Sequence, residues 1–255
     1  MAQPDDSSTT TSNNSATCRF QDDFELYSFE IVRAMKQKEK SYHPSQCLKC
    51  QIYITPTQRE TLISSMINLS RKHNIKRDTL FMAVNYLDRF LKVVTVTEDC
   101  FELVGLTCMM IACKVEECQP PKMEEFLTSC THYYKKAEMK RLEIIILNYI
   151  DFRLSPPIAP HFLEYIIHFH QHHYHQFSQQ TYIELVNIAN QVLLKILPTY
   201  RFNHIKSSIL AASAFEYAKI ICGYATSVCS YPYQDRVTFI TISTTVDHLR
   251  DFFEK

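Results

Sequence analysis

Apolar side chains recur every three or four residues along most of the chain, which is the spacing of one face of an α-helix. Over Thr57–His73 the apolar face advances in steps of 4, 3 and 4 residues. Leu80–Leu91 repeats this spacing, and Asp78 is predicted to be the N-cap of that helix. Strand-like alternation occurs only over Val237–Thr245. The pattern therefore predicts an all-α chain.

A helix with a different character is expected from Glu98 to Cys113, where residues are apolar or small nearly all round. Such a helix is buried on every side. After the break at Pro120-Pro121 we expect a short helix over Met123–Cys130, and then an amphipathic helix over Ala137–Ile150. Five helices are thus predicted in the first half of the chain.

A cluster of prolines after Ser155 indicates a domain junction, because proline disfavours helix in its own and the preceding residue. Beyond it we expect helices at 160–173, 179–196, 204–221, 233–242 and 243–254. The middle one is rich in small residues and ends in Lys219, 105 positions after Lys114. We predict a disordered tail (1–19), an N-terminal helix and connector (20–53), and two helical units (54–155 and 156–255).

Composition excludes several classes of function. The 255 residues include only two glycines, which are too few for a glycine-rich phosphate-binding loop. The 27 basic and 27 acidic side chains balance, whereas a dedicated nucleic-acid binder carries a basic excess. No apolar run is long enough to span a membrane, so we expect a soluble intracellular protein whose ten cysteines are reduced thiols. No cofactor is implied.

Four motifs follow one another in the first half: Asn85-Tyr-Leu-Asp-Arg-Phe-Leu91, Leu103-Val-Gly105, Lys114-Val-Glu-Glu117 and Arg141-Leu-Glu143. Together they resemble the N-terminal box of the cyclins, over Gln58–Leu163. The second half is similar to the second cyclin box only in its helix rhythm and in Leu197-Pro198 before an alanine-rich helix. The resemblance implies two tandem five-helix cyclin boxes preceded by an N-terminal helix.

The resemblance also implies a function. Cyclins are regulatory subunits that bind and activate a cyclin-dependent kinase, so we expect a non-catalytic partner of a kinase catalytic subunit, in the nucleus or the cytoplasm. Kinase substrates or inhibitors are further candidate partners. In cyclins the residues that match Lys114 and Glu143 contact the regulatory helix of the kinase. By the same resemblance, the surrounding surface is lined by Val115, Glu117, Cys118, Leu147, Phe152 and Leu154.

The residues themselves leave an alternative for Lys114 and Glu143. A lysine at the end of a helix complements the partial negative charge there, and together with a nearby carboxylate it suits the backbone of a partner helix. Alternatively, the two side chains form an ordinary intramolecular ion pair, which contributes little to stability when exposed.

The chain departs from the family at the helix that recruits substrates. Many cyclins carry Met-Arg-Ala-Ile-Leu there, with a tryptophan three residues on, where this chain has Gln58-Arg-Glu-Thr-Leu62 and Ser65. We predict weak or absent binding of leucine-containing docking peptides, although a merely solvated helix face fits the same residues. The degenerate patch comprises Gln58, Thr61, Leu62, Ser65 and Glu102. The motifs mix A/B-type and D-type features, as in a divergent cellular or a virus-encoded cyclin.

Other candidate chemistry is weaker. His168, His172 and His175 could share a helical face for a divalent metal, but no carboxylate or cysteine is spaced to complete the site. Cys47 and Cys50 have Cys-x-x-Cys spacing without a second pair, which favours packing in a loop. The rival to a kinase regulator is a cyclin-fold adaptor, scaffold or transcription-linked protein.

Overall fold

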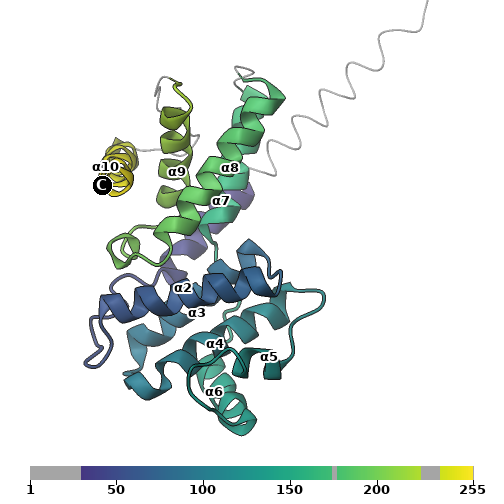
Figure 1. Cartoon of the computed structure of the whole chain (residues 1–255). Helices are drawn as coiled ribbons and strands as arrows, with labels where there is room; N and C mark the ends of the chain where they lie inside the picture. The colour runs from purple at the N-terminus through teal and green to yellow at the C-terminus, as the bar shows by residue number, and fades with distance from the viewer. Residues whose placement is uncertain (1–29, 174–176, 225–235, 255) are drawn as a thin grey trace, which may run out of the picture.

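The computed structural model describes residues 30–173, 177–224 and 236–254, and every regular element within these ranges is helical (Figure 1). The all-α prediction is thus confirmed. The predicted tail of residues 1–19 lies outside the described residues. A helix over residues 30–42 precedes a connector that runs to Ile54. None of the described helices is both long enough and apolar enough to cross a membrane.

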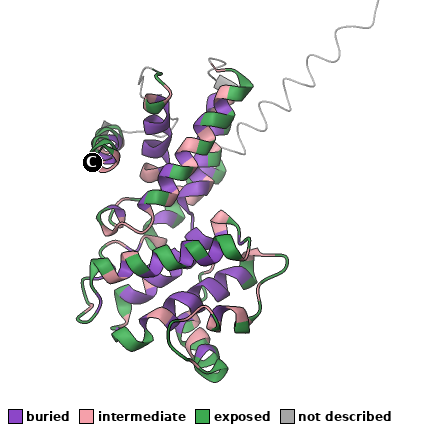
Figure 2. Ribbon diagram, viewed as in Figure 1, coloured by how far each residue is buried: buried purple, intermediate pink, exposed green. Residues whose placement is uncertain are grey.

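The first half forms the five predicted helices, packed around a central one. These are α2 (Pro56–Lys72), α3 (Arg77–Val93), α4 (Glu98–Glu116), α5 (Met123–Leu127) and α6 (Lys136–Tyr149). Helix α4 is buried along nearly its whole length from Phe101 to Cys113, as its composition predicted (Figure 2). A β-carbon on Gly105 would lie 2.7 Å from Leu62 Cδ2, so glycine lets α2 approach α4 closely.

An extended segment after α6 leads into the second half, which packs beside the first. It comprises α7 (Ala159–His173), α8 (Gln179–Ile196), a 3₁₀ turn η1 (Tyr200–Phe202), α9 (Ser207–Ile221) and α10 (Arg236–Phe253). The predicted junction near Ser155 falls in the segment between α6 and α7.

Our division of the last segment into two helices, 233–242 and 243–254, is wrong, because α10 runs unbroken to Phe253. The strand-like run is also helical. Ile242, Val246 and Leu249 are buried at steps of 4 and 3, the period of a helix face. The hydroxyl groups of Thr244 and Thr245 donate hydrogen bonds to carbonyls four residues earlier, so the β-branched residues fit within the helix.

Helix α3 begins differently from the prediction. Asp78 is not the N-cap: the helix starts at Arg77, and its N-cap Lys76 makes no side-chain capping bond. Instead, Glu117 at the end of α4 accepts a hydrogen bond from the Lys76 backbone N–H (2.8 Å) and another from the Thr79 hydroxyl (2.6 Å). A carboxylate far away in the sequence thus satisfies the first turn of α3.

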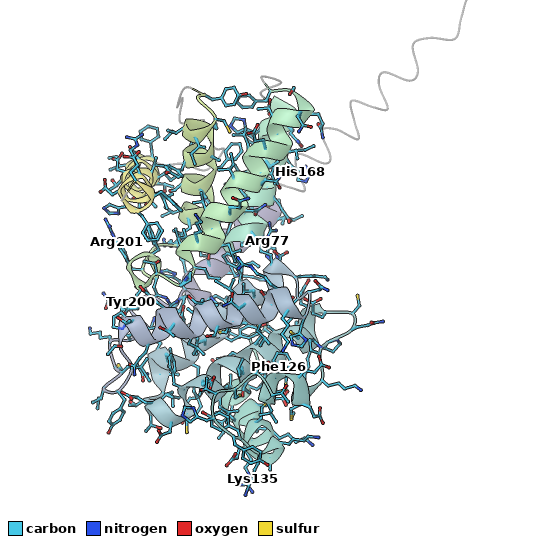
Figure 3. All side chains as sticks on the ribbon, in the orientation of Figure 1. Arg77, Phe126, Lys135, His168, Tyr200 and Arg201 are labelled. Atoms are coloured by element: carbon cyan, nitrogen blue, oxygen red, sulfur yellow. The ribbon has the colours of Figure 1, made fainter. Side chains whose placement is uncertain are left out.

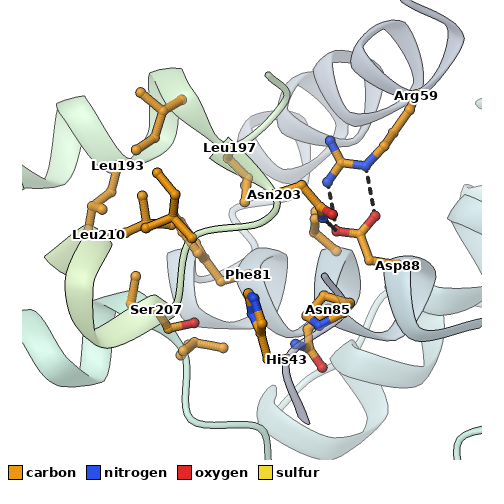
Figure 4. A pocket seen from close by; sticks show the side chains of 16 residues that line it. His43, Arg59, Phe81, Asn85, Asp88, Leu193, Leu197, Asn203, Ser207 and Leu210 are labelled. Carbon is orange, nitrogen blue, oxygen red and sulfur yellow. Dashed lines mark hydrogen bonds and ion pairs between the residues drawn. The ribbon is translucent and has the colours of Figure 1, made fainter. Parts of the chain in front are cut away.

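A buried ion pair joins the two halves. Arg59 on α2 and Asp88 on α3 are 2 % and 3 % exposed, and two parallel hydrogen bonds of 2.7 Å connect them. The remaining Arg59 nitrogen donates to the Pro198 carbonyl at 2.7 Å, and the Asn203 amide donates to Asp88 at 2.9 Å. Since Pro198 and Asn203 flank η1, the pair fixes the second half against the first (Figure 4).

A contact between an arginine and an aromatic ring, and a small cavity, also lie at this junction. Tyr200 lies near the end of α2 that carries Arg59 (Figure 3). The Arg59 guanidinium stacks over the Tyr200 ring, 5.8 Å from its centroid. A cavity of about 90 Å3 lies beside the ion pair and is lined by apolar side chains such as Phe81 and Leu193, with Asn85 and Asn203 among its polar neighbours (Figure 4).

The N-terminal helix is attached to the second half. Glu39 is buried and accepts hydrogen bonds from the backbone N–H (2.7 Å) and hydroxyl (2.8 Å) of Ser208, in the first turn of α9. Burial raises the pKa of Glu39, and the bonds from Ser208 oppose that rise only in part. A carboxylate at a helix N-terminus is favoured by the helix dipole. The His43 ring also contacts the His204 carbonyl at 3.1 Å.

Replacing Arg59 with methionine keeps most of its volume but leaves Asp88 buried without its partner. We expect Arg59→Met to lower the free energy of unfolding in urea by about 3–5 kcal/mol. Arg71→Met, on the exposed face of the same helix, is the matched control and should change it by less than about 0.5 kcal/mol. Similar unfolding midpoints for the two variants would show that the pair does not hold the halves together.

Candidate functional site

Lys114 and Glu143 meet at the surface of the first half. The Lys114 Nζ lies 2.5 Å from Glu143 Oε1, and the two side chains are 47 % and 17 % exposed. Lys114 lies in the last turn of α4, and Glu143 lies in the middle of α6. The two residues do meet, as both interpretations of the sequence require, and the contact between them is an intramolecular ion pair.

Local packing explains why this pair forms. Met139, Ile146 and Ile150 make the buried stripe that holds α6 in the core, and Glu143 lies at the edge of this stripe. Lys114 directly follows the fully buried Cys113, so its side chain emerges where α4 leaves the core. A lysine also complements the C-terminal end of the α4 dipole.

Apolar side chains lie near the pair in the sequence, at the end of α4, along α6 and in the loop after α6. Val115 and Phe152 are exposed, Leu147 and Leu154 are half-buried against the core, and Cys118 is exposed. Exposed aromatic and aliphatic side chains beside a charged pair are typical of a protein-binding surface.

Ile144 also belongs to this surface and was missed from the sequence. It is 61 % exposed and lies three residues before Leu147, which places both on one flank of α6. A signal existed, because Ile144-Ile-Ile-Leu147 is a run of four apolar residues, and a helix cannot turn all four toward the core.

Glu117 is the predicted site residue with a separate structural task. Its carboxylate is turned toward the start of α3, where it accepts the bonds from Lys76 and Thr79 described above. Lys76 Nζ also donates to the Glu116 carbonyl at 3.1 Å. Glu117 therefore anchors the end of α4, next to the exposed Val115.

The second half does not repeat this arrangement. Lys219 occupies the matching position at the end of α9, but it is only 2 % exposed and lies 2.8 Å from Glu216 on the same helix. The two lysines, 105 positions apart, thus lie in different surroundings, one at the surface and the other in the core.

The degenerate docking patch is polar at the surface. Gln58 is occupied in the capping box of α2, while Thr61 and Ser65 are exposed. Leu62, the one apolar anchor left, is buried against Gly105. Within the described ranges, no large exposed hydrophobic side chain lies on α2.

Glu102, the last residue of the degenerate patch, is engaged by the loop after α5. Its carboxylate accepts hydrogen bonds from the Thr131 backbone N–H (2.9 Å) and hydroxyl (2.8 Å). Burial acts to raise the pKa of Glu102, but the bonds from Thr131 and His132 outweigh it and lower that pKa. The carboxylate is therefore held ionised by its own chain.

The described residues contain no group of three or more His, Cys, Asp or Glu side chains that could hold a metal ion. The side chains of His172 and His175 lie outside the described residues. Cys47 is fully buried and donates a hydrogen bond to Asp88 at 3.3 Å, whereas Cys50 is exposed. Burial raises the pKa of the Cys47 thiol, so this cysteine packs in the core rather than acting as a ligand.

Several known proteins are similar to this chain in sequence. Residues 30–155 match the family model for the N-terminal domain of cyclins. The chain is 33 % identical to Cyclin-A2-1 of Arabidopsis thaliana over 74 % of this chain and 42 % of that protein. It is 34 % identical to human Cyclin-O over 57 % of this chain and 41 % of that protein. The chain therefore spans about two fifths of the length of these curated relatives.

Solved structures share the fold at low sequence identity. A viral cyclin from herpesvirus saimiri matches with a TM-score of 0.70 and 16 % identity, over 86 % of this chain and 96 % of that one. A chain of the yeast RNA Pol II CTD kinase CTDK-1 complex matches with a TM-score of 0.58 and 13 % identity, over 87 % and 71 %. From its motifs, its fold and these relatives together, the chain belongs to the cyclin family.

Proposed function

We propose that this chain is the regulatory subunit of a cyclin-dependent kinase and that it activates the kinase in cell-cycle control. The observation that carries the proposal is the Lys114–Glu143 pair at the surface, on helices that also carry the exposed side chains of Val115 and Ile144. Family members place the matching Lys and Glu against the regulatory helix of the kinase. The structures of kinase complexes that share this fold support a partner of the same class.

The pair remains able to bind a partner while its own ion pair persists. An ammonium group carries three donors and a carboxylate has several acceptor sites, so a contact between them leaves others unused. Lys114 can therefore donate to carbonyl groups of a partner helix while Glu143 accepts from its N–H groups. The exposed apolar side chains of α4 and α6 would exclude water from these bonds and strengthen them.

Activation in this proposal involves no chemistry on the cyclin chain. Binding favours the kinase conformation in which its regulatory helix brings a glutamate to the catalytic lysine, which phosphoryl transfer requires. The chain then acts as a ligand that shifts a conformational population, and its effect is limited by its preference for the active state.

Removing either member of the pair should weaken kinase binding without unfolding the protein. We expect Lys114→Ala and Glu143→Ala each to reduce affinity for a cyclin-dependent kinase catalytic subunit about thirtyfold or more, because truncating one partner of a charged interface contact costs about 2–5 kcal/mol. Activation of histone phosphorylation should fall in parallel. Titration calorimetry with a panel of purified catalytic subunits measures the affinity.

Lys136 and Glu124 form a matched control, since they are also a solvent-exposed lysine–glutamate pair between neighbouring helices. Alanine at either position should leave kinase affinity within about twofold. Unchanged binding by the Lys114 and Glu143 variants would reject the proposed interface. If no catalytic subunit of the panel binds the wild-type chain, an adaptor role outside kinase activation replaces the proposal.

The polar face of α2 predicts poor recruitment of docking peptides. A fluorescent leucine-containing peptide that binds a cyclin with the intact Met-Arg-Ala-Ile-Leu run should bind this chain at least about 100-fold more weakly, because several large apolar contacts are missing. Fluorescence polarisation measures both affinities. The triple variant Gln58→Met, Thr61→Ile, Ser65→Trp should recover part of the binding, and tight binding by the wild type would contradict the prediction.

A further inference from the structure

The loop after α6 has an unusual backbone. Asp151 and Phe152 both adopt the left-handed conformation, with φ values of 55° and 51°. The Phe152 N–H donates to the Leu147 carbonyl (2.9 Å) and the Asp151 N–H to the Asn148 carbonyl (3.1 Å), the two bonds that close a Schellman motif. Glycine is the usual residue at such a helix end, whereas here the two successive residues Asp151 and Phe152 both carry side chains.

This backbone strain has a visible consequence. The left-handed conformation costs a residue with a β-carbon about 1–2 kcal/mol, so surrounding contacts must hold it in place. The Phe152 ring lies on this strained turn and is 61 % exposed, and the chain then continues to the half-buried Leu154. Residues strained in this way are concentrated at functional sites.

Two side chains of α3 hold the loop from outside it. The Arg89 guanidinium donates to the Ile150 and Arg153 carbonyls, both at 2.7 Å, so its two nitrogens span the strained residues between them. The Tyr86 hydroxyl donates to the Leu154 carbonyl at 2.5 Å. Tyr86, Asp88 and Arg89 all come from the Asn85–Leu91 motif.

The same arginine reaches the N-terminal helix. Its guanidinium stacks on the ring of Tyr42, 4.9 Å from the centroid, and the Asn85 amide donates to the Tyr42 carbonyl at 3.1 Å. Arg89 thus lies between the end of helix 30–42 and the loop after α6. A fork of guanidinium donors and a planar stacking surface are properties that lysine lacks.

We propose that Arg89, assisted by Tyr86, is a positioning residue that presents the Phe152 ring to the kinase. This inference rests on the proposed kinase-regulatory function. In it, Arg89 makes no kinase contact itself and acts by fixing the carbonyls on either side of Asp151 and Phe152. The strained turn then has one conformation before the partner arrives, so binding does not have to order it.

The test is a double-mutant cycle with Arg89→Lys and Phe152→Ala in the full chain, read as affinity for a cyclin-dependent kinase catalytic subunit. Lysine keeps the charge but cannot bridge both carbonyls, so we expect about a tenfold loss in the wild-type background. In the Phe152→Ala background the same change should cost less than about threefold, because the group that Arg89 presents is already absent. Arg201→Lys, at an exposed arginine of η1, is the matched control and should have no effect.

Amide hydrogen exchange of the chain without kinase provides a second, independent test. Arg89→Lys should speed exchange of the amides of residues 151–153 severalfold, while Phe152→Ala leaves them protected. Tyr86→Phe removes one hydroxyl and keeps the ring. It should cause a smaller loss of kinase affinity and a smaller increase in amide exchange, and it serves as the test if Arg89→Lys folds poorly.

The outcomes separate the two proposals. Equal losses from Arg89→Lys in both backgrounds, or unchanged amide exchange, would overturn the positioning role while leaving the kinase proposal intact. A wild-type chain that binds no catalytic subunit rejects the proposed function, and the role of Arg89 in presenting Phe152 falls with it.

Discussion

The ion pair between Arg59 and Asp88 is the interaction on which the arrangement of the helices depends. A buried charge is costly unless all of its bonding groups find partners, and here the partners come from four parts of the chain. Cys47 of the connector and Asn203 after η1 donate to Asp88, and Arg59 of α2 bridges Asp88 and Pro198. These directional bonds add to the apolar packing between the halves and favour one arrangement of them.

Helix α3 extends that constraint to the surface. Asp88 points into the network, while its neighbours Tyr86 and Arg89 bind the loop after α6, and Asn85 binds the end of the N-terminal helix. Four polar side chains within five residues thus connect the core junction to the N-terminal helix and to the loop that carries Phe152 and Leu154. The position of that loop is coupled to the core, because the same short segment binds both.

Much of the fold could be predicted from the sequence, because apolar side chains spaced three or four residues apart indicate an α-helix. The five helices of the first half and the buried character of α4 were both predictable. The burial of Arg59 was not, since arginine is usually exposed and its partner lies 29 residues away. The unbroken α10 was predicted as two helices, across a β-branched run whose alternation also fits a strand. The cap that Glu117 supplies to α3 depends on tertiary structure alone.

In the function that we propose, the kinase binds the surface formed by the end of α4, the exposed flank of α6 and the loop after it. Hydrogen exchange of the chain, with and without a cyclin-dependent kinase catalytic subunit, tests it most directly. The account predicts slower exchange concentrated in residues 114–118 and 143–154, with α8 and the polar face of α2 unchanged. Protection confined to α8 and α10, with none at these two segments, would contradict it.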